Sequence, residues 1–437
     1  MVVPIAILVV FAALAALMYA GRLPALLALP VLAVGVGAIG GLSWQQVAQV
    51  VVADGALRLH AAYAAAMVGS MLAQVVEKTG VAETIVKNAA ELGGDRPLPM
   101  ALLMTVVVAI LFVTLGGLGA VIMVATIVFP ILLSVGVTPL AAGCLFLFGM
   151  SIGGVFNLVN WQLYTDILKL PHAVILRLAA PLCGLLLLAA VIFAVVHGRA
   201  PRRFWAGVHP QRQRPPWYCL LTPLVPLAIV LPFAIRNWLL SAKGHNPGFE
   251  FPIITALLVG LVWGVLTAGG NRVQLLTRSV IDGIAAVAPA VGLMLGIGMV
   301  MNAFAGPPGT QPEQWKVAEQ IRPLLLRAIP SSALGFVATF GLLAPLALYR
   351  GPLNLWGMGA GLVGAILATG RMSPGAVMAA FFSVGLIQGV CDPTNTHNVW
   401  IASHLDVDVQ QILKRTLPYV WAASIAGLAV GAALFLR

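Results

Sequence analysis

Charged residues are scarce in this sequence. Only 8% of the 437 residues are Asp, Glu, Lys or Arg, whereas soluble domains carry about 25%. Hydrophobic residues make up 61% of the chain, which leaves too little polar surface to cover a globule in water. The composition therefore excludes a soluble domain and predicts an all-α polytopic membrane protein embedded in a lipid bilayer.

Cysteines and catalytic motifs are also few. The four cysteines form no CxxC pair, and no Cys/His cluster has the spacing of a metal site. No P-loop and no G-x-S-x-G motif is present. We therefore expect no enzyme, no metal and no cofactor. The net charge of +11 does not call for nucleic acid, because the basic residues lie mostly in short segments between apolar runs, as in cytoplasmic loops.

Long apolar runs dominate the rest of the chain. Those able to cross about 30 Å of hydrocarbon as helices are 3–20, 24–41, 57–77, 173–196, 218–235, 250–268, 281–304 and 410–436. Two further regions, 98–134 and 331–370, are too long for one span and are interrupted at 116–119 and 350–354. Each is followed by a segment that begins at a proline and loses its apolar character partway, at 139–167 and 374–402.

The two interrupted regions are copies of one another. A single constant offset aligns 116–166 with 351–401 without a gap. A second shared pair, Asp54-Gly55 and Asp282-Gly283, extends the duplication at a slightly different offset. An internal repeat of this kind is typical of secondary transporter folds. The aligned identities include Gly116 with Gly351, Pro139 with Pro374 and Asn160 with Asn395.

The repeat predicts two copies, residues 1–197 and 217–437, joined by a basic linker at 198–216. Five crossings in the first copy, an odd number, predict that the second copy is inverted. The Arg-rich linker is expected to be cytoplasmic, which places the N-terminus in the periplasm. In chain order we expect a scaffold at 1–80, a re-entrant hairpin and broken helix at 98–168, a span at 173–196, a scaffold at 217–304, a re-entrant hairpin at 331–370, a broken helix at 374–402 and a span at 410–436.

The interruptions point to a polar site. Unpaired backbone is too costly against lipid and survives at membrane depth only where it faces protein or a wet cavity. Paired breaks in two inverted copies therefore predict one shared site near the bilayer midplane, where half-helix N-termini suit an anion. The alternative for either break alone is close helix packing or a simple kink.

The second break carries charges that the first one lacks. Asp392 and His397 replace Asn157 and Gln162 of the first copy. A carboxylate in a low-dielectric cavity is a candidate proton carrier, which makes Asp392 and His397 our candidates for ion or proton coupling. A satisfied interior histidine is an equally good interpretation of His397.

A guanidinium and a set of small polar groups are the candidates for holding the solute. The fork of Arg350 is well shaped for a carboxylate, although a snorkelling side chain or a structural pair with Asp392 would also explain an arginine there. Amide and hydroxyl groups fit a hydroxylated or carboxylated organic solute better than a bare metal. The candidate substrate-binding residues are Gly117, Gly119, Asn157, Asn160, Arg350, Gly351, Asn354, Thr394, Asn395, Thr396 and Asn398.

These features resemble the ion transporter superfamily of bacterial secondary transporters, above all the citrate and gluconate permease types. The resemblance covers nearly the whole chain in architecture, and its local motifs are GGLG with GGVFNLVN and RGPLNL with GVCDPTNTHN. It implies a bacterial inner-membrane transporter, dimeric through its scaffold, with a transport domain that moves as an elevator. It also implies a small organic anion such as a di- or tricarboxylate or a sugar acid as the solute, driven by H⁺ or Na⁺.

The hairpin tips depart from the divalent-anion symporters of this superfamily, which carry Ser-Asn-Thr there. The tips of this chain read Gly-Gly-Leu-Gly and Gly-Pro-Leu-Asn. This difference puts a two-Na⁺ mechanism in doubt and favours proton symport through Asp392. The alternatives are a cation/proton antiporter, an inorganic-anion exporter, or the membrane subunit of a binding-protein-dependent secondary transporter.

Overall fold

The computed structural model describes residues 2–20, 22–198, 215–330 and 332–436, and in these residues it is helical throughout, without a strand. Most of the predicted linker, residues 199–214, lies outside the described residues. The first half contains α1 (Val2–Tyr19), α2 (Ala25–Ile39), the π-helix η1 (Gln46–Asp54), α3 (Gly55–Leu57), α4 (His60–Lys78), α5 (Val81–Gly93), α6 (Pro97–Phe112), α7 (Gly117–Ser134), α8 (Pro139–Val155), α9 (Leu158–Leu168) and α10 (His172–His197).

The second half repeats this order of elements. It contains the 3₁₀ turn η2 (Trp217–Leu221), α11 (Val225–Ala242), α12 (Ile253–Thr267), α13 (Arg272–Ala305), the 3₁₀ turn η3 (Pro312–Gln314), α14 (Lys316–Ala328), α15 (Ala333–Leu343), the irregular 3₁₀ segment η4 (Ala344–Arg350), α16 (Gly359–Thr369), α17 (Pro374–Cys391), α18 (Thr396–His404) and α19 (Val409–Phe435). We keep the names of the predicted elements and call α6–α7 hairpin 1, α15–η4–α16 hairpin 2, α8–α9 broken helix 1 and α17–α18 broken helix 2, although α15 and α16 do not pack along one another.

Eight helices of the described chain are long and apolar enough to cross a membrane, or nine if the bent pair α8–α9 counts as one span. The apolar runs located most of them. Two helices extend well beyond the runs: the stretch from η1 to α4 covers 46–78 rather than 57–77, and α13 covers 272–305 rather than 281–304. The run underestimates both helices because polar residues such as Gln49 and Arg278 remain helical at their ends.

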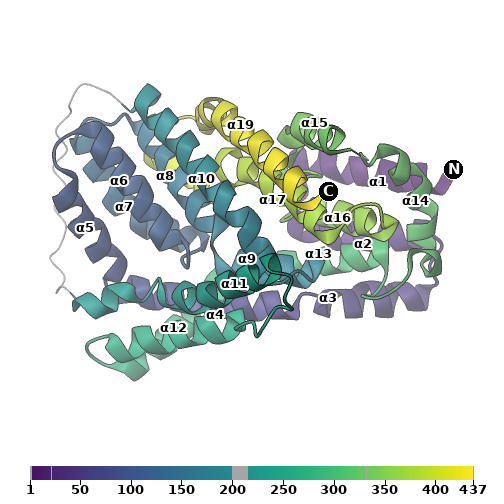
Figure 1. Cartoon of the computed structure of the whole chain (residues 1–437), viewed down its shortest axis with the longest axis horizontal. Helices are drawn as coiled ribbons and strands as arrows, with labels where there is room; N and C mark the ends of the chain where they lie inside the picture. The colour runs from purple at the N-terminus through teal and green to yellow at the C-terminus, as the bar shows by residue number, and fades with distance from the viewer. Residues whose placement is uncertain (1, 21, 199–214, 331, 437) are drawn as a thin grey trace.

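Two helices of 13 residues, α5 and α14, fall outside the predicted spans. They occupy equivalent places, since the offset that aligns the two interrupted regions also carries Val81–Gly93 onto Lys316–Ala328. Each places charged residues on one side and buried residues such as Val86 or Ile321 on the other. In Figure 1 they lie at opposite ends of the long axis of the molecule. The sequence did not reveal them because an amphipathic helix is not a long apolar run.

The two halves meet where α3–α4 crosses α13. A Cβ atom added to Gly55 would lie 2.7 Å from the Cα of Met299, and one added to Gly283 would lie 2.8 Å from the Cα of Met71. Glycine is required at both crossings because any side chain would collide with the facing backbone. The two contacts are reciprocal, since the offset that carries Gly55 to Gly283 also carries Met71 to Met299. The paired helices therefore run antiparallel.

The remaining helices of the two halves pack together beside this crossing. α6 packs along α8, α17 along α19, and α10 against α19. Figure 1 shows α10 and α19 side by side, with α17 next to them and α11, α12 and α4 along the opposite edge. Within this bundle, broken helix 1 also contacts broken helix 2, so that the two interruptions come together from opposite halves of the chain.

Candidate functional site

Both broken helices start in the same way. Pro139 and Pro374 each occupy the first turn of their helix, where a missing N–H costs nothing. The preceding hydroxyl caps the helix: Thr138 accepts a hydrogen bond from the N–H of Ala141 at 3.1 Å, and Ser373 does so in the second copy at 3.2 Å. These matched N-caps fix where each helix enters the bundle.

The interruptions also fall at matched places. Broken helix 1 is bent by 51° between Val155 and Leu158. Broken helix 2 loses its helical hydrogen bonding at residues 392–395 and resumes at Thr396. Both interruptions of helical hydrogen bonding are therefore present in the described chain, although only the first bends its helix by more than 40°. The carbonyls that each interruption frees must find other donors.

The side chain of Asn157 ties the first break to hairpin 1. Its Nδ2 donates to the carbonyls of Phe112 at 3.2 Å and Leu115 at 3.4 Å, at the end of α6. Its Oδ1 accepts a hydrogen bond from the N–H of Val159 at 3.0 Å and so caps α9. An amide is needed here because the hairpin offers only acceptors and the helix start offers a donor.

Asp392 ties the second break to hairpin 2, but as an acceptor of hydrogen bonds, whereas Asn157 donates to hairpin 1. Its Oδ2 accepts from the backbone N–H of Arg350 at 3.3 Å, at the tip of hairpin 2. Its Oδ1 accepts from the N–H of Thr394 at 2.9 Å and from the Thr394 hydroxyl at 2.6 Å. Hairpin 2 offers a donor where hairpin 1 offers carbonyls. This difference explains why the second copy has a carboxylate where the first has an amide.

Other predicted polar residues satisfy the freed carbonyls. Asn160 Nδ2 donates to the carbonyl of Gly154 at 2.9 Å, and Asn395 Nδ2 donates to that of Gln388 at 2.8 Å. Asn398 Nδ2 bonds the carbonyl of Val390 at 2.9 Å. These amides make the breaks tolerable inside an apolar bundle, since an unpaired buried carbonyl is costly. Their part in solute binding stays a prediction.

A cavity of about 180 Å³ lies between the two broken helices and the tip of hairpin 2. It brings together three of the predicted residues: Asn160 from broken helix 1, Asn354 from hairpin 2 and His397 from broken helix 2. We call it the central cavity. The other lining residues that bear on its chemistry are Ser151, Tyr164, Trp356, Phe382 and Gln388.

Two lining residues of the central cavity have a buried polar atom without a hydrogen-bond partner in the described chain. These atoms are Nδ2 of Asn354 and Nε2 of His397. Asn354 is 1% exposed, and its Oδ1 already accepts from the N–H of Trp356 at 2.9 Å, so its amide donor remains free. Buried polar atoms are rarely left unpaired, so each of these two atoms calls for an explanation, such as a water molecule, an ion or a functional role. Among the residues that the structure describes, no acidic side chain lines the cavity.

The guanidinium of Arg350 is not among the cavity lining. Its Nη1 donates to the carbonyl of Trp356 at 3.4 Å, which holds the tip of hairpin 2 together. Tyr349 and Arg350 are both in the left-handed region, with φ of 57° and 55°, an uncommon conformation for residues other than glycine. Gly351 follows them and has no room for a side chain against the Leu346 carbonyl.

The remaining predicted residues lie apart from the central cavity. The side chains of Thr394 and Thr396 are exposed, and Thr394 is engaged with Asp392. At hairpin 1, Gly117 and Gly119 are exposed, with open space where a Cβ would stand. Gly117 has a φ of 82°, which favours glycine for a conformational reason.

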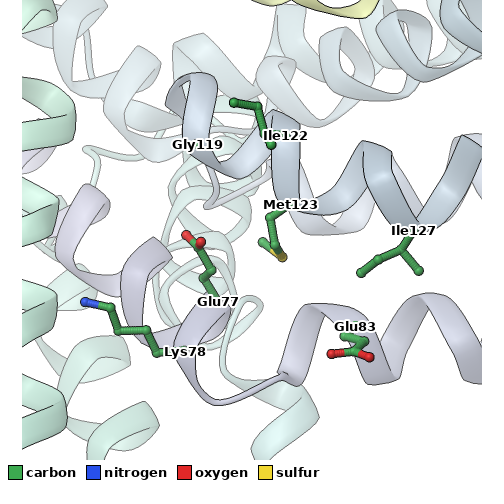
Figure 2. Close-up of a pocket in the computed structure, with 7 residues that line it drawn as sticks. All are labelled: Glu77, Lys78, Glu83, Gly119, Ile122, Met123 and Ile127. Carbon is green, nitrogen blue, oxygen red and sulfur yellow. The ribbon is translucent and has the colours of Figure 1, made fainter. Parts of the chain in front are cut away.

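Gly119 borders a second hollow of about 440 Å³, between α7, α5 and the end of α4. Figure 2 shows Glu77 reaching toward α7 on one side of it, whereas Lys78 extends away. Lys78 forms an ion pair with Asp282, and Glu83 pairs with Lys87 at 2.6 Å. Within the described residues, no three His, Cys, Asp or Glu side chains lie close enough together to hold a metal ion.

Several cavity residues were not among the sequence candidates. Tyr164 and Phe382 stack with ring centroids 4.8 Å apart and form an apolar wall from both broken helices. Gln388 Nε2 donates to Asn395 Oδ1 at 2.9 Å. The sequence could have indicated Gln388, since it immediately precedes the second break motif, but nothing local distinguishes Tyr164 or Phe382 from core aromatics.

No family model matches the sequence, and no curated protein matches it. Among solved structures, the fold is similar to the crystal structure of the Alcanivorax borkumensis YdaH transporter, which is described as having an unusual topology. The TM-score is 0.52 at 16% sequence identity, over 86% of this chain and 87% of that chain. The chain is a multi-pass membrane protein with a YdaH-like fold. The prediction of an all-α polytopic membrane protein is thereby confirmed.

Proposed function

We propose that the protein is a secondary active transporter of the ion transporter superfamily and carries a small organic anion through the central cavity. The observation that carries the proposal is the cavity itself, bounded by both broken helices and lined by Asn354 and His397, each of which has a buried polar atom without a hydrogen-bond partner in the described chain. A volume of about 180 Å³ suits a small solute, since drug-sized ligands occupy about 300–1,000 Å³.

The absence of acidic lining among the described residues favours an anion over a cation. A bound Na⁺ or other cation requires carboxylate or carbonyl oxygens, whereas the free groups here are an amide donor and an imidazole. The antiparallel crossing of α4 and α13 supports two inverted copies, and likeness to a transporter fold supports transport rather than catalysis. The scaffold, the elevator movement and the inner-membrane location remain parts of this proposal.

Proton coupling through Asp392 is the proposed driving step. The carboxylate is fully buried and accepts three hydrogen bonds, one of them from the tip of hairpin 2. A proton on Asp392 would turn one acceptor oxygen into a donor and so weaken its bond to the N–H of Arg350. Hairpin 2 would then be freer to move when a proton is bound.

Uptake of labelled carboxylates into proteoliposomes under an imposed pH gradient tests the proposal. Asn354→Asp keeps the oxygen that accepts from Trp356, but replaces the free donor with a negative charge inside the cavity. We expect its KM for an anion to rise by about tenfold or more, the equivalent of about 1.4 kcal/mol. The matched control is Asn271→Asp, an exposed helix cap whose Oδ1 also accepts a backbone N–H.

Unchanged KM in Asn354→Asp would contradict the placement of the solute. Exchange of Na⁺ for H⁺ in vesicles without any organic anion would instead support an antiporter. Coupling to the pH gradient that survives in Asp392→Asn would remove the proton role of Asp392 while leaving the solute site intact.

A further inference from the structure

A second buried carboxylate, besides Asp392, lies outside the central cavity. Asp166, near the end of α9, is 8% exposed. Its Oδ2 accepts a hydrogen bond from the backbone N–H of Ala62 at 2.7 Å, and its Oδ1 accepts from Nε2 of Gln162 at 3.0 Å. The contact joins residues 104 positions apart and connects broken helix 1 to the predicted scaffold helix α4.

The partner N–H belongs to the first turn of α4. The helix from η1 to α4 is interrupted by a turn at Arg58 and Leu59, and α4 begins at His60 without a side-chain cap of its own. Asp166 therefore supplies, from another helix, the acceptor that the start of α4 lacks. A negative charge in this place is also favoured by the dipole of α4.

Both described partners of Asp166 are donors, which fits the ionised form. A proton on the carboxyl would remove the charge that faces the start of α4 and leave one fewer acceptor. No ion pair to Asp166 is present in the described chain, so burial of its charge is offset by the two neutral donors, by the helix dipole and by the more distant charges of Lys169 and His60.

We propose that Asp166 is a proton-sensitive latch between broken helix 1 and α4: the ionised carboxylate holds the two together, and protonation weakens the contact. This inference deepens the proposed function and rests on it, because movement of broken helix 1 against the scaffold would require the contact to loosen. Asp166 acts here as a positioning residue, since it does not line the central cavity.

Other titratable groups near Asp166 could also change the contact with pH, so their effects must be distinguished from that of Asp166. The charges that act on it are His60 of α4 and Lys169 at the end of α9, and the Asp166 carboxylate in turn acts on Tyr63 of α4. The adjoining helix α10 brings His172, which lies 3.9 Å from Glu250, and also Arg177, Cys183 and His197. Neither α12 nor α17 carries a Lys, Arg, His, Asp or Glu.

Hydrogen exchange of the full-length protein in lipid nanodiscs tests the latch without any transport substrate. We expect the protection of the peptide covering residues 60–66, corrected for intrinsic exchange, to fall on acidification. The slope should approach about tenfold per pH unit if one proton controls the opening. In Asp166→Asn the protection should be independent of pH. Asp54→Asn, an exposed acid on the same span, should behave as the wild type.

Three outcomes would overturn the latch. They are protection in the wild type that does not change with pH, a wild-type pH dependence in Asp166→Asn, and a pH dependence that disappears in His60→Gln, which would assign the effect to the imidazole. If Asp166→Asn fails to fold, the wild type and His60→Gln still decide. Failure of the proposed function would appear separately, as absence of wild-type uptake in proteoliposomes.

Discussion

The hydrogen bonds of Asn157 give a quantitative test of how the breaks are stabilised. Asn157→Ala removes the donor to the carbonyls of Phe112 and Leu115 and the acceptor for the N–H of Val159. Phe112 and Leu115 are 3% and 1% exposed, so water does not readily replace the lost amide. Each buried group left unpaired costs about 1–3 kcal/mol.

The 3.4 Å bond to Leu115 is weak, so we count one carbonyl and one N–H and expect a loss of about 2–6 kcal/mol. Equilibrium unfolding in mixed SDS and detergent micelles measures it. Asn271→Ala is the matched control, since its Oδ1 also accepts a backbone N–H but in an exposed position, and it should cost about 1 kcal/mol. A loss in Asn157→Ala no larger than that of the control would refute the reasoning.

Two further predictions use the same unfolding measurement. Gly55→Val should lower the free energy of unfolding by about 1–3 kcal/mol, because its Cβ would lie 2.7 Å from the Cα of Met299. Gly184→Ala has open space around it and should be neutral or slightly stabilising. Equal effects of the two substitutions would contradict the close crossing. Arg58→Met should lower the free energy of unfolding by about 2–4 kcal/mol, because Nη1 of Arg58 donates to Oδ1 of Asn302 at 2.5 Å and to the carbonyl of Gly306 at 2.9 Å. A decrease below about 1 kcal/mol would show that these hydrogen bonds contribute little to stability.

Much of the helical architecture could be predicted because its signals are local. Long apolar runs located most of the spans, although the runs 24–41 and 250–268 form helices of only 15 residues and the run 218–235 corresponds to a helix at Val225–Ala242. The combination of a leading proline with later glycine and asparagine located both breaks. The offset between the two copies aligns helices as well as identical residues, and it also superimposes the residue ranges of α5 and α14. The inverted arrangement of the copies stays a prediction, supported by the reciprocal contacts of Gly55 and Gly283.

The site was harder to predict from the sequence because its contacts join residues that are far apart in the chain. Asn157 and Asp392 could be identified as unusual, but not that each holds the tip of its own hairpin. Arg350 was a candidate either for solute binding or for a structural role, and only the fold shows that its guanidinium bonds the carbonyl of Trp356. Asp166 gave no local signal, since only the fold places it against the start of α4.

The polar residues near the breaks have two different roles in the bundle. Asn395 and Asn398 look like ligands in the sequence but satisfy backbone carbonyls of broken helix 2. Asn354 and His397 have buried polar atoms left over. Asn398 also keeps a buried Oδ1 without a partner in the described chain, but it does not line the central cavity. The candidate solute site is therefore defined by the residues that both line this cavity and have an unpaired polar atom.

The most direct test of this site is a cryo-electron microscopy map of the protein in nanodiscs with a transported carboxylate bound. We predict ligand density in the central cavity, within hydrogen-bond distance of Nδ2 of Asn354 and Nε2 of His397. Density in the hollow beside Glu77 and Gly119 instead, with the central cavity empty, would contradict the account.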